Sequence, residues 1–279
     1  MAVRKVLKLY LFLPLIVILC SFEFYRLNSV DENYSFLFVA NYRLKSQIDS
    51  MDENSSYTDY WRLYIGDGMS LFTSLRFLSM DSIKRIESEK GNPYGPSMDW
   101  YMNHGTKNTL VVFKNYHSQT ITTHDKLAPI ISEHYVYEES SPIEWELLED
   151  TTSIGSLTCF AATTTFGGRK WTAWYAPEIP VPDGPFKFKG LPGLVIRIAD
   201  STGTWEYELV DFKKEANQFA FNCSDAEHIS VTKREFFKQK RNFYDNRIAI
   251  MKTMGYTFTD EREARKLHSK DNNWIELHP

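Results

Sequence analysis

The sequence lacks the compact motifs that identify most enzyme active sites. No serine lies in a Gly-x-Ser-x-Gly elbow, and no two histidines have the HxH or HxxxH spacing of a chelating pair. His117, His124 and His134 are close in sequence, but their intervals match no metal motif and predict surface histidines. Gly167-Gly168 predicts a hairpin turn, because it does not open a helix as phosphate loops do. We therefore expect no enzyme, no catalytic residue, no metal site and no cofactor.

Cysteine is scarce, and neither sign of charge is in large excess. The three cysteines are Cys20, Cys159 and Cys223. In an exported protein that has lost its leader, Cys159 and Cys223 either form one disulfide or remain as two buried thiols. The net charge of −4 gives no support for a nucleic-acid partner.

The apolar run near the N-terminus is shorter than an ordinary membrane-spanning helix. Basic residues precede it, and it covers residues 9–22, whereas a spanning helix needs about 20 apolar residues. This pattern predicts that residues 1–22 are a signal peptide or an N-terminal membrane anchor and that residues 23–279 form a single domain. Three alternatives stay open: a cleaved secretory signal, an uncleaved transmembrane anchor extending to Tyr25, and a lipid anchor on Cys20. Each places the body outside the cytoplasm, in the periplasm or cell envelope, and the anchors add membrane association.

The body has the pattern of a β-rich protein. Aromatic residues make up 15% of the chain, and short β-branched and aromatic runs recur about every ten residues with turn residues between them. We expect a mainly β (α+β) fold with a curved antiparallel sheet, or half-barrel, of about ten strands. The predicted strands cover 34–44, 57–65, 70–77, 110–116, 119–123, 134–138, 144–148, 156–164, 170–175, 195–199, 204–212 and 218–223, with a last short strand over 273–277.

Helices are few in this pattern. A short surface helix is expected over 80–90. A stronger helix begins with the capping box Thr232-Lys233-Arg234-Glu235, continues with helical spacing of aromatic residues and ends near Gly255. We expect it to pack its apolar face on the sheet and to expose a basic face to solvent. The alternative is that the basic face contacts an anionic membrane surface or a partner.

The stretch Gly190-Leu191-Pro192-Gly193-Leu194-Val195 is the most distinctive structural motif. Proline sets φ near −65° and glycine accepts positive φ, so the stretch predicts a type II turn leading into a strand. The turn would fix the register of the neighbouring strands. Nearby, Arg169 is predicted to pair with Glu178 or Asp183.

Large apolar side chains around this motif suggest a ligand-binding surface. Two leucines at a turn, and aromatic residues on both faces of the strand before it, form either a buried core or a binding face. The residues of this hypothesis are Trp171, Trp174, Tyr175, Leu191 and Leu194.

The central block resembles the GLPGLI family of exported envelope proteins. The resemblance lies in Cys159-Phe160-Ala161-Ala162, in residues 166–180 and in residues 184–195, with Val195 in place of the final isoleucine. It extends to the segments 70–74 and 273–277, so the family domain would cover 23–279. The family is one of unknown function, and the resemblance therefore implies no catalytic residue. By fold analogy alone, the expected sheet looks like the half-barrels of periplasmic lipoprotein carriers.

Three functions follow as hypotheses. The leading one is a non-enzymatic envelope protein that binds a hydrophobic or lipid-like ligand, a peptide or an envelope protein partner in the concave face of the sheet. The second is a structural or assembly component that docks through its sheet edge and its basic helix. The third is an uncharacterised hydrolase.

Overall fold

The computed structural model describes residues 33–92, 106, 108–129, 131, 133–140, 143–220 and 228–278. The predicted leader, Cys20, Cys223 and most of the loop after residue 92 lie outside these residues. In the part of the chain that is described, no helix is both long and apolar enough to span a membrane.

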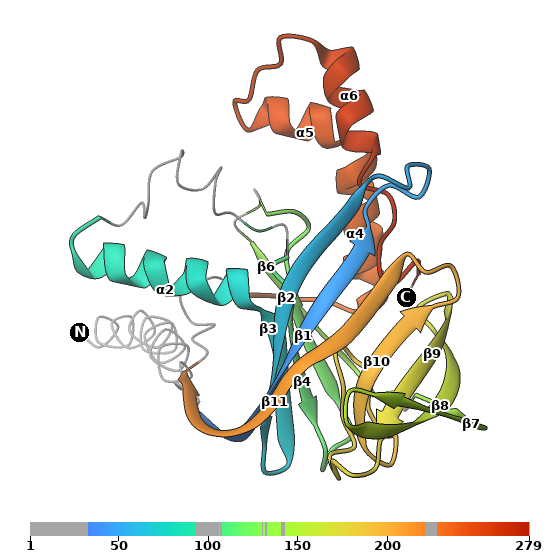
Figure 1. Cartoon of the computed structure of the whole chain (residues 1–279). Helices are drawn as coiled ribbons and strands as arrows, with labels where there is room; N and C mark the ends of the chain where they lie inside the picture. The colour runs from blue at the N-terminus through green and yellow to red at the C-terminus, as the bar shows by residue number, and fades with distance from the viewer. Residues whose placement is uncertain are drawn as a thin grey trace, which may run out of the picture.

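The described strands form one open, strongly curved sheet (Figure 1). Its order is β12-β6-β5-β4-β3-β2-β1-β11-β10-β9-β8-β7, and all neighbours are antiparallel except β12 and β6, which are parallel. This confirms the mainly β prediction, with two more strands than the ten expected. The strands are β1 (Asn33–Gln47), β2 (Ser56–Gly66), β3 (Met69–Ser74), β4 (Val111–Asn115), β5 (Ile121–Asp125), β6 (His134–Glu139), β7 (Glu146–Ile154), β8 (Leu157–Phe166), β9 (Arg169–Ala176), β10 (Leu194–Asp200), β11 (Trp205–Ala220) and β12 (His228–Ser230).

The main hydrophobic core lies on the inner face of the curved sheet. Trp61 and Phe72 of β2 and β3 belong to the same buried cluster as Trp171 of β9 and Leu194 of β10. These strands are far apart in the sheet order, so the sheet must curl for them to share one core. Some of the aromatic residues that indicated a β-rich fold, such as Tyr42 and Tyr207, help to fill this interior.

Helix α2 (Leu75–Glu89) packs on the opposite face of the sheet (Figure 1). Phe77 and Leu78 of α2 pack against a buried cluster that contains Val39, Tyr64 and Leu71, and these three residues alternate with inner-face residues along their strands. The helix begins five residues earlier than the predicted range of 80–90. The Ser74 side chain accepts a hydrogen bond from the Phe77 backbone N–H, which caps the first turn at the end of β3.

Of the C-terminal helices, α4 (Lys233–Asp245) lies against the sheet, and α5 (Arg247–Thr253) and α6 (Glu261–Ser269) project beyond its end (Figure 1). The predicted capping box is confirmed at the start of α4, which buries Phe236 and Phe243 against β6. The long helix expected up to residue 254 is divided at Asn246 into α4 and α5. A further helix, α6, follows in the polar tail.

Two local predictions near the ends of the sheet are wrong. The segment 273–277 is not a strand. It is held instead by contacts to Arg169 and to the strand end near residue 47. A strand needs a ladder of backbone hydrogen bonds to a neighbouring strand. Here the carbonyls of residues 273–275 accept from side chains, and the N–H groups of Asn273 and Leu277 donate to isolated backbone carbonyls of Ile48 and Gly167.

The corner before β10 is not a type II turn either. The Gly193 N–H donates to the Leu191 carbonyl at 2.8 Å, which is a three-residue γ-turn around Pro192. Gly193 is required by space, because a Cβ there would lie 2.3 Å from the Ala176 backbone oxygen. The corner does lead into β10, which pairs with β9 and β11 as expected, with a bulge at Ile196.

Candidate functional site

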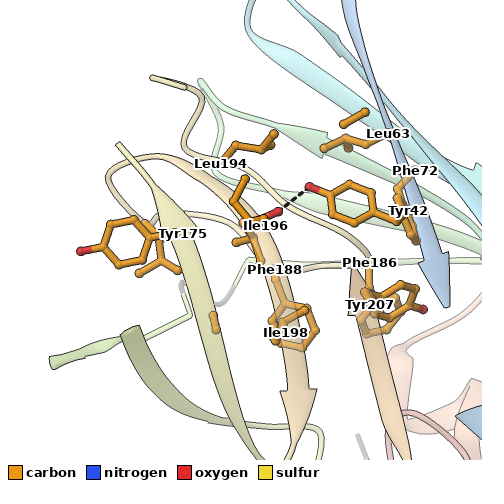
Figure 2. Packing of buried hydrophobic residues seen from close by; sticks show 14 of the residues in the cluster. Tyr42, Leu63, Phe72, Tyr175, Phe186, Phe188, Leu194, Ile196, Ile198 and Tyr207 are labelled. Atoms are coloured by element: carbon orange, nitrogen blue, oxygen red, sulfur yellow. Dashed lines mark hydrogen bonds between the residues drawn. The ribbon is translucent and has the colours of Figure 1, made fainter. Parts of the chain in front are cut away.

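The segment 183–189 (Asp-Gly-Pro-Phe-Lys-Phe-Lys) fills the interior of the curved sheet. Its alternating pattern suggests a half-exposed strand, yet Phe186, Lys187, Phe188 and Lys189 are all buried. Phe188 packs with its ring centre 4.8 Å from that of Trp171. Figure 2 shows the two phenylalanines among the rings and branched side chains of β10 and β11, with the Tyr42 hydroxyl bonded to the Val195 carbonyl. This segment is the inner support on which the candidate site is built.

A buried ion pair holds one end of the segment to β4. Lys114 and Asp183 are both fully buried, and the Lys114 ammonium donates to the Asp183 carboxylate and to the Gly184 carbonyl at 2.7 Å. The Tyr116 hydroxyl donates to the other Asp183 oxygen at 2.5 Å. Burial lowers the pKa of Lys114 and is opposed by Asp183. Because this ion pair is buried and both charges also form further hydrogen bonds, it fixes the segment in one position.

A second buried network holds the middle of the segment to the C-terminal tail and to α4. Lys187 lies 2.5 Å from Glu139 and 2.7 Å from Glu276, and Lys233 of α4 reaches the same two carboxylates at 2.7 and 2.5 Å. Burial opposes the charged form of Lys187, but Glu276 and the other neighbours outweigh it and raise the pKa of Lys187. Burial likewise opposes the charge of Glu139, and Lys187 and Lys233 lower its pKa. Sheet, inner segment, helix and tail are thus joined by charge.

An aromatic cavity lies between the inner face of the sheet, α4 and the tail, with a volume of about 240 Å³. Its walls come from segments far apart in sequence. Two carboxylates in these walls are neutralised by ion pairs. Asp125 pairs with Lys240, and Glu276 pairs with Lys187 and Lys233. The rings that line it are those of Tyr57, Trp61, Tyr137, Phe186, Trp205, Tyr207, Phe236, Phe237, Tyr244 and Trp274. An apolar cleft with a few polar groups is the usual form of a small-molecule site.

Three nitrogen atoms in the walls of the aromatic cavity are buried donors without a partner. They are Trp61 Nε1, Arg247 Nε and Trp274 Nε1, and none has a hydrogen-bond partner in the described part of the chain. Buried donors are almost always paired, and one left unpaired costs about 1–3 kcal/mol. Water or a ligand with acceptor atoms in the cavity would satisfy them.

A second hollow, the arginine cavity, adjoins the first and has a volume of about 400 Å³. It lies among α4, α5, α6 and the tail, and its lining includes Arg241, Arg247 and Arg265. Tyr244, Arg247, Asp271 and Trp274 line both cavities. The two hollows therefore meet at one shared wall, where an unpaired guanidinium nitrogen and an unpaired indole nitrogen are found.

The residues predicted from sequence to bind a ligand lie elsewhere. Trp171, Tyr175, Leu191 and Leu194 are buried in the main core, and Trp174 is half-buried against it. None of the five lines the aromatic cavity or the arginine cavity. The sequence offered a closer signal in the aromatic spacing of the helix after Thr232, since Phe236, Phe237 and Tyr244 all line the aromatic cavity.

Arg169 has a structural role, but its predicted partners Glu178 and Asp183 are wrong. Its guanidinium pairs with Asp200 at 2.9 Å and donates to the Asn273 side chain at 2.5 Å and to the Trp274 carbonyl at 2.6 Å. Asp183 is instead taken by Lys114, and Glu178 accepts from the Thr158 backbone. Arg169 thereby fixes the tail whose tryptophan forms part of the cavity wall.

The predicted disulfide and the predicted surface histidines are the remaining sequence candidates. Cys159 is fully buried, and burial raises the pKa of its thiol. Its proposed disulfide partner Cys223 lies outside the described residues. The rings of His124 and His134 both lie near His228, at 5.8 and 6.3 Å. His124 is half-buried, not a surface residue as predicted, and its burial, followed by the charges of His228 and His134, lowers its pKa to about 4. His117 is exposed at the turn after β4, and no group of three potential ligands among the described residues is arranged to hold a metal.

Comparison with known proteins gives a short family match and a similar fold. Residues 168–197 match a family described as a protein of unknown function, Porph_ging. No curated protein matches the chain. Two solved structures of PNGF-II, in the C2 and P21 space groups, are similar, with TM-scores of 0.50 and 0.48 and identities of 11% and 12%. Each match covers 74% of this chain and 33% of that chain, so this chain spans about a third of the length of those proteins. At this identity the C2 structure supports the fold alone.

Proposed function

We propose that the chain is an exported cell-envelope protein of the GLPGLI family that binds a small ligand without transforming it. The match to the Porph_ging family of unknown function covers residues 168–197, which include the Gly-Leu-Pro-Gly-Leu corner and much of the central block. The N-terminal pattern of basic residues followed by an apolar run supports export. The observation that carries the binding role is the aromatic cavity, because its walls are fixed by two buried charge networks.

Native mass spectrometry tests this role on the full chain extracted from cells in mild detergent. We expect an added mass from a bound small molecule that is lost on denaturation. Leu110 lines the aromatic cavity, so Leu110→Trp should fill it and remove the added mass. Val210→Trp is the matched control, because Val210 is 57% exposed on β11. If Leu110→Trp carries the added mass to the same extent as Val210→Trp, the ligand does not bind in this cavity.

A second candidate function, docking to an envelope protein through the sheet edge, is supported by β7. This edge strand is exposed along most of its length, and exposed edges can pair with another chain. The basic helix contributes less than expected, since Lys233 and Lys240 of α4 are used in internal ion pairs. Cross-linking in intact cells through Thr152 should capture one reproducible protein if docking is the function.

A further inference from the structure

We infer that the ligand is an amphipathic carboxylate whose apolar body lies in the aromatic cavity and whose carboxylate is held by Arg247. This inference rests on the proposed function and specifies the chemistry of the occupant. It follows from three features of the two cavities: their unpaired donors, their charge and their shared wall.

The unpaired donors require acceptor atoms in the occupant. Trp61 is only 2% exposed, its ring stacks on Phe72 at 5.0 Å, and its Nε1 has no partner among the described residues. Trp274 Nε1 and Arg247 Nε, in the shared wall, are also buried and have no hydrogen-bond partner among the described residues. These three atoms are donors, so an occupant with oxygen acceptors fits them. Glu276 Oε2, a buried acceptor in the wall that also has no hydrogen bond among the described residues, lies 2.5 Å from the Lys233 ammonium and is already neutralised by it.

The charge at the shared wall favours an anion. The guanidinium of Arg247 lies over the rings of Phe243 and Tyr244, at 5.9 and 5.2 Å, and forms no ion pair in the part of the chain that is described. Arg241 lies over the Trp274 ring at 5.3 Å and donates to the Leu277 carbonyl. An arginine without a carboxylate partner, held over two rings, offers its planar fork to a ligand carboxylate.

The acidic residues of the cavities do not cancel this preference. Asp125 and Glu276 are neutralised by lysines, as described above. Asp245 and Asp271 line the arginine cavity together with Arg241, Arg247 and Arg265. Arg265 pairs with Glu261 at 3.7 Å, so the preference for an anion rests on Arg247 and not on an excess of positive charge around the cavity. The Asp271 carboxylate accepts from the Tyr244 hydroxyl at 3.4 Å.

The shared wall explains why the ligand should be amphipathic. On one side lie the aromatic rings and on the other the arginines, and Arg247 lines both. A molecule with an apolar body and one carboxylate can place its body against the rings while its head reaches the guanidinium. The aromatic cavity, at about 240 Å³, limits the part of the body it can enclose to about the size of a small ring system.

A panel of three probes with one apolar body tests the inference by calorimetric titration of the full chain in mild detergent. The probes are 4-phenylbutyrate, 4-phenylbutyramide and 4-phenylbutylamine, which carry an anionic, a neutral and a cationic head. We expect the acid to bind about tenfold more tightly than the amide, as one charge-assisted hydrogen bond would give, and the amine to bind most weakly. Arg247→Gln should remove the preference for the acid, while Arg265→Gln, at a side chain 62% exposed, should leave most of it.

The outcomes separate this inference from the proposed function. If acid and amide bind equally, and Leu110→Trp abolishes both, the cavity binds ligands but the carboxylate assignment is wrong. If the preference for the acid persists in Arg247→Gln, the assignment to Arg247 is wrong. If no probe binds at millimolar concentration, the inferred ligand class is wrong, and the mass-spectrometric test still decides the proposed function. If Arg247→Gln does not fold, the comparison of the three heads on the unmodified chain decides the inference alone.

Discussion

Replacing Lys114 with methionine should be among the most destabilising single changes in this protein. Lys114 and Asp183 have 0% exposed side chains, and together they fasten the inner segment to β4. Lys114→Met keeps the length of the side chain but leaves the Asp183 carboxylate buried with only the Tyr116 hydroxyl and the Gly184 N–H as partners. Removing one partner of a buried ion pair costs about 3–5 kcal/mol.

The size of this effect can be measured against an exposed ion pair in the same sheet. Arg197 and Glu206 pair at 2.9 Å with 47% and 24% of their side chains exposed, and such a pair is worth about 0–1 kcal/mol. Thermal unfolding followed by tryptophan fluorescence should therefore show Lys114→Met melting roughly 6–20 °C below the unmodified protein, and Arg197→Gln within a few degrees of it.

A double variant identifies the cause of the loss. Lys114→Met with Asp183→Asn removes both charges, so its destabilisation should be smaller than the sum of the two single losses. If Lys114→Met melts within a few degrees of Arg197→Gln, or if the two single losses simply add, the buried charge network does not hold the inner segment as described.

Three further changes test the corner, a half-buried histidine and the tail. Gly193→Ala should lower the free energy of unfolding by at least about 2 kcal/mol, because the new Cβ would lie 2.3 Å from a backbone oxygen. Gly203→Ala is the control, since φ there is +68° but the surroundings are open, and it should cost only about 1–2 kcal/mol. Denaturant titration measures both losses. The pKa of His124 is lowered to about 4, so the unfolded state binds more protons and stability should fall as pH drops from about 6.5 toward 4; His124→Phe should flatten urea-unfolding free energies between pH 7 and pH 5, and an unchanged slope would contradict this. Arg169→Met leaves Asp200 buried without its cation and removes the hydrogen bonds that hold the tail. Proteolysis should therefore cut after residue 260 faster than in the unmodified chain. Equal cleavage rates would show that Arg169 does not hold the tail in place.

Much of the fold could be predicted because strand and helix signals are local. Residues 57–65, 134–138 and 170–175 alternate in the way that a strand with one buried face requires, and each is a strand. The capping box at Thr232 needs only residues three apart, and it is present. The segment 273–277 was misjudged because its apolar residues pack on rings and its polar groups bond to Arg169, with no strand beside it.

The candidate site could not be predicted in the same way. Its lining comes from segments that lie more than 200 residues apart in sequence, such as Ser46 and Ile275. The sequence instead pointed to Trp171 and Leu194, which are conspicuous in pattern but are enclosed in the core. A large apolar residue looks the same in sequence whether it borders a cavity or fills a core.

By itself, the sequence determined the class of the fold, the start of the main helix and the strand order around the central corner, because these depend on residues close together in the chain. Only the tertiary structure decided that the alternating Phe186–Lys189 run is wholly buried. A lysine is buried in its charged form only when carboxylates reach it, and for Lys187 these come from residues 139 and 276. The contacts between charged residues form only when the sheet curls and the tail closes over it. These contacts also decide where a cavity with unpaired donors remains.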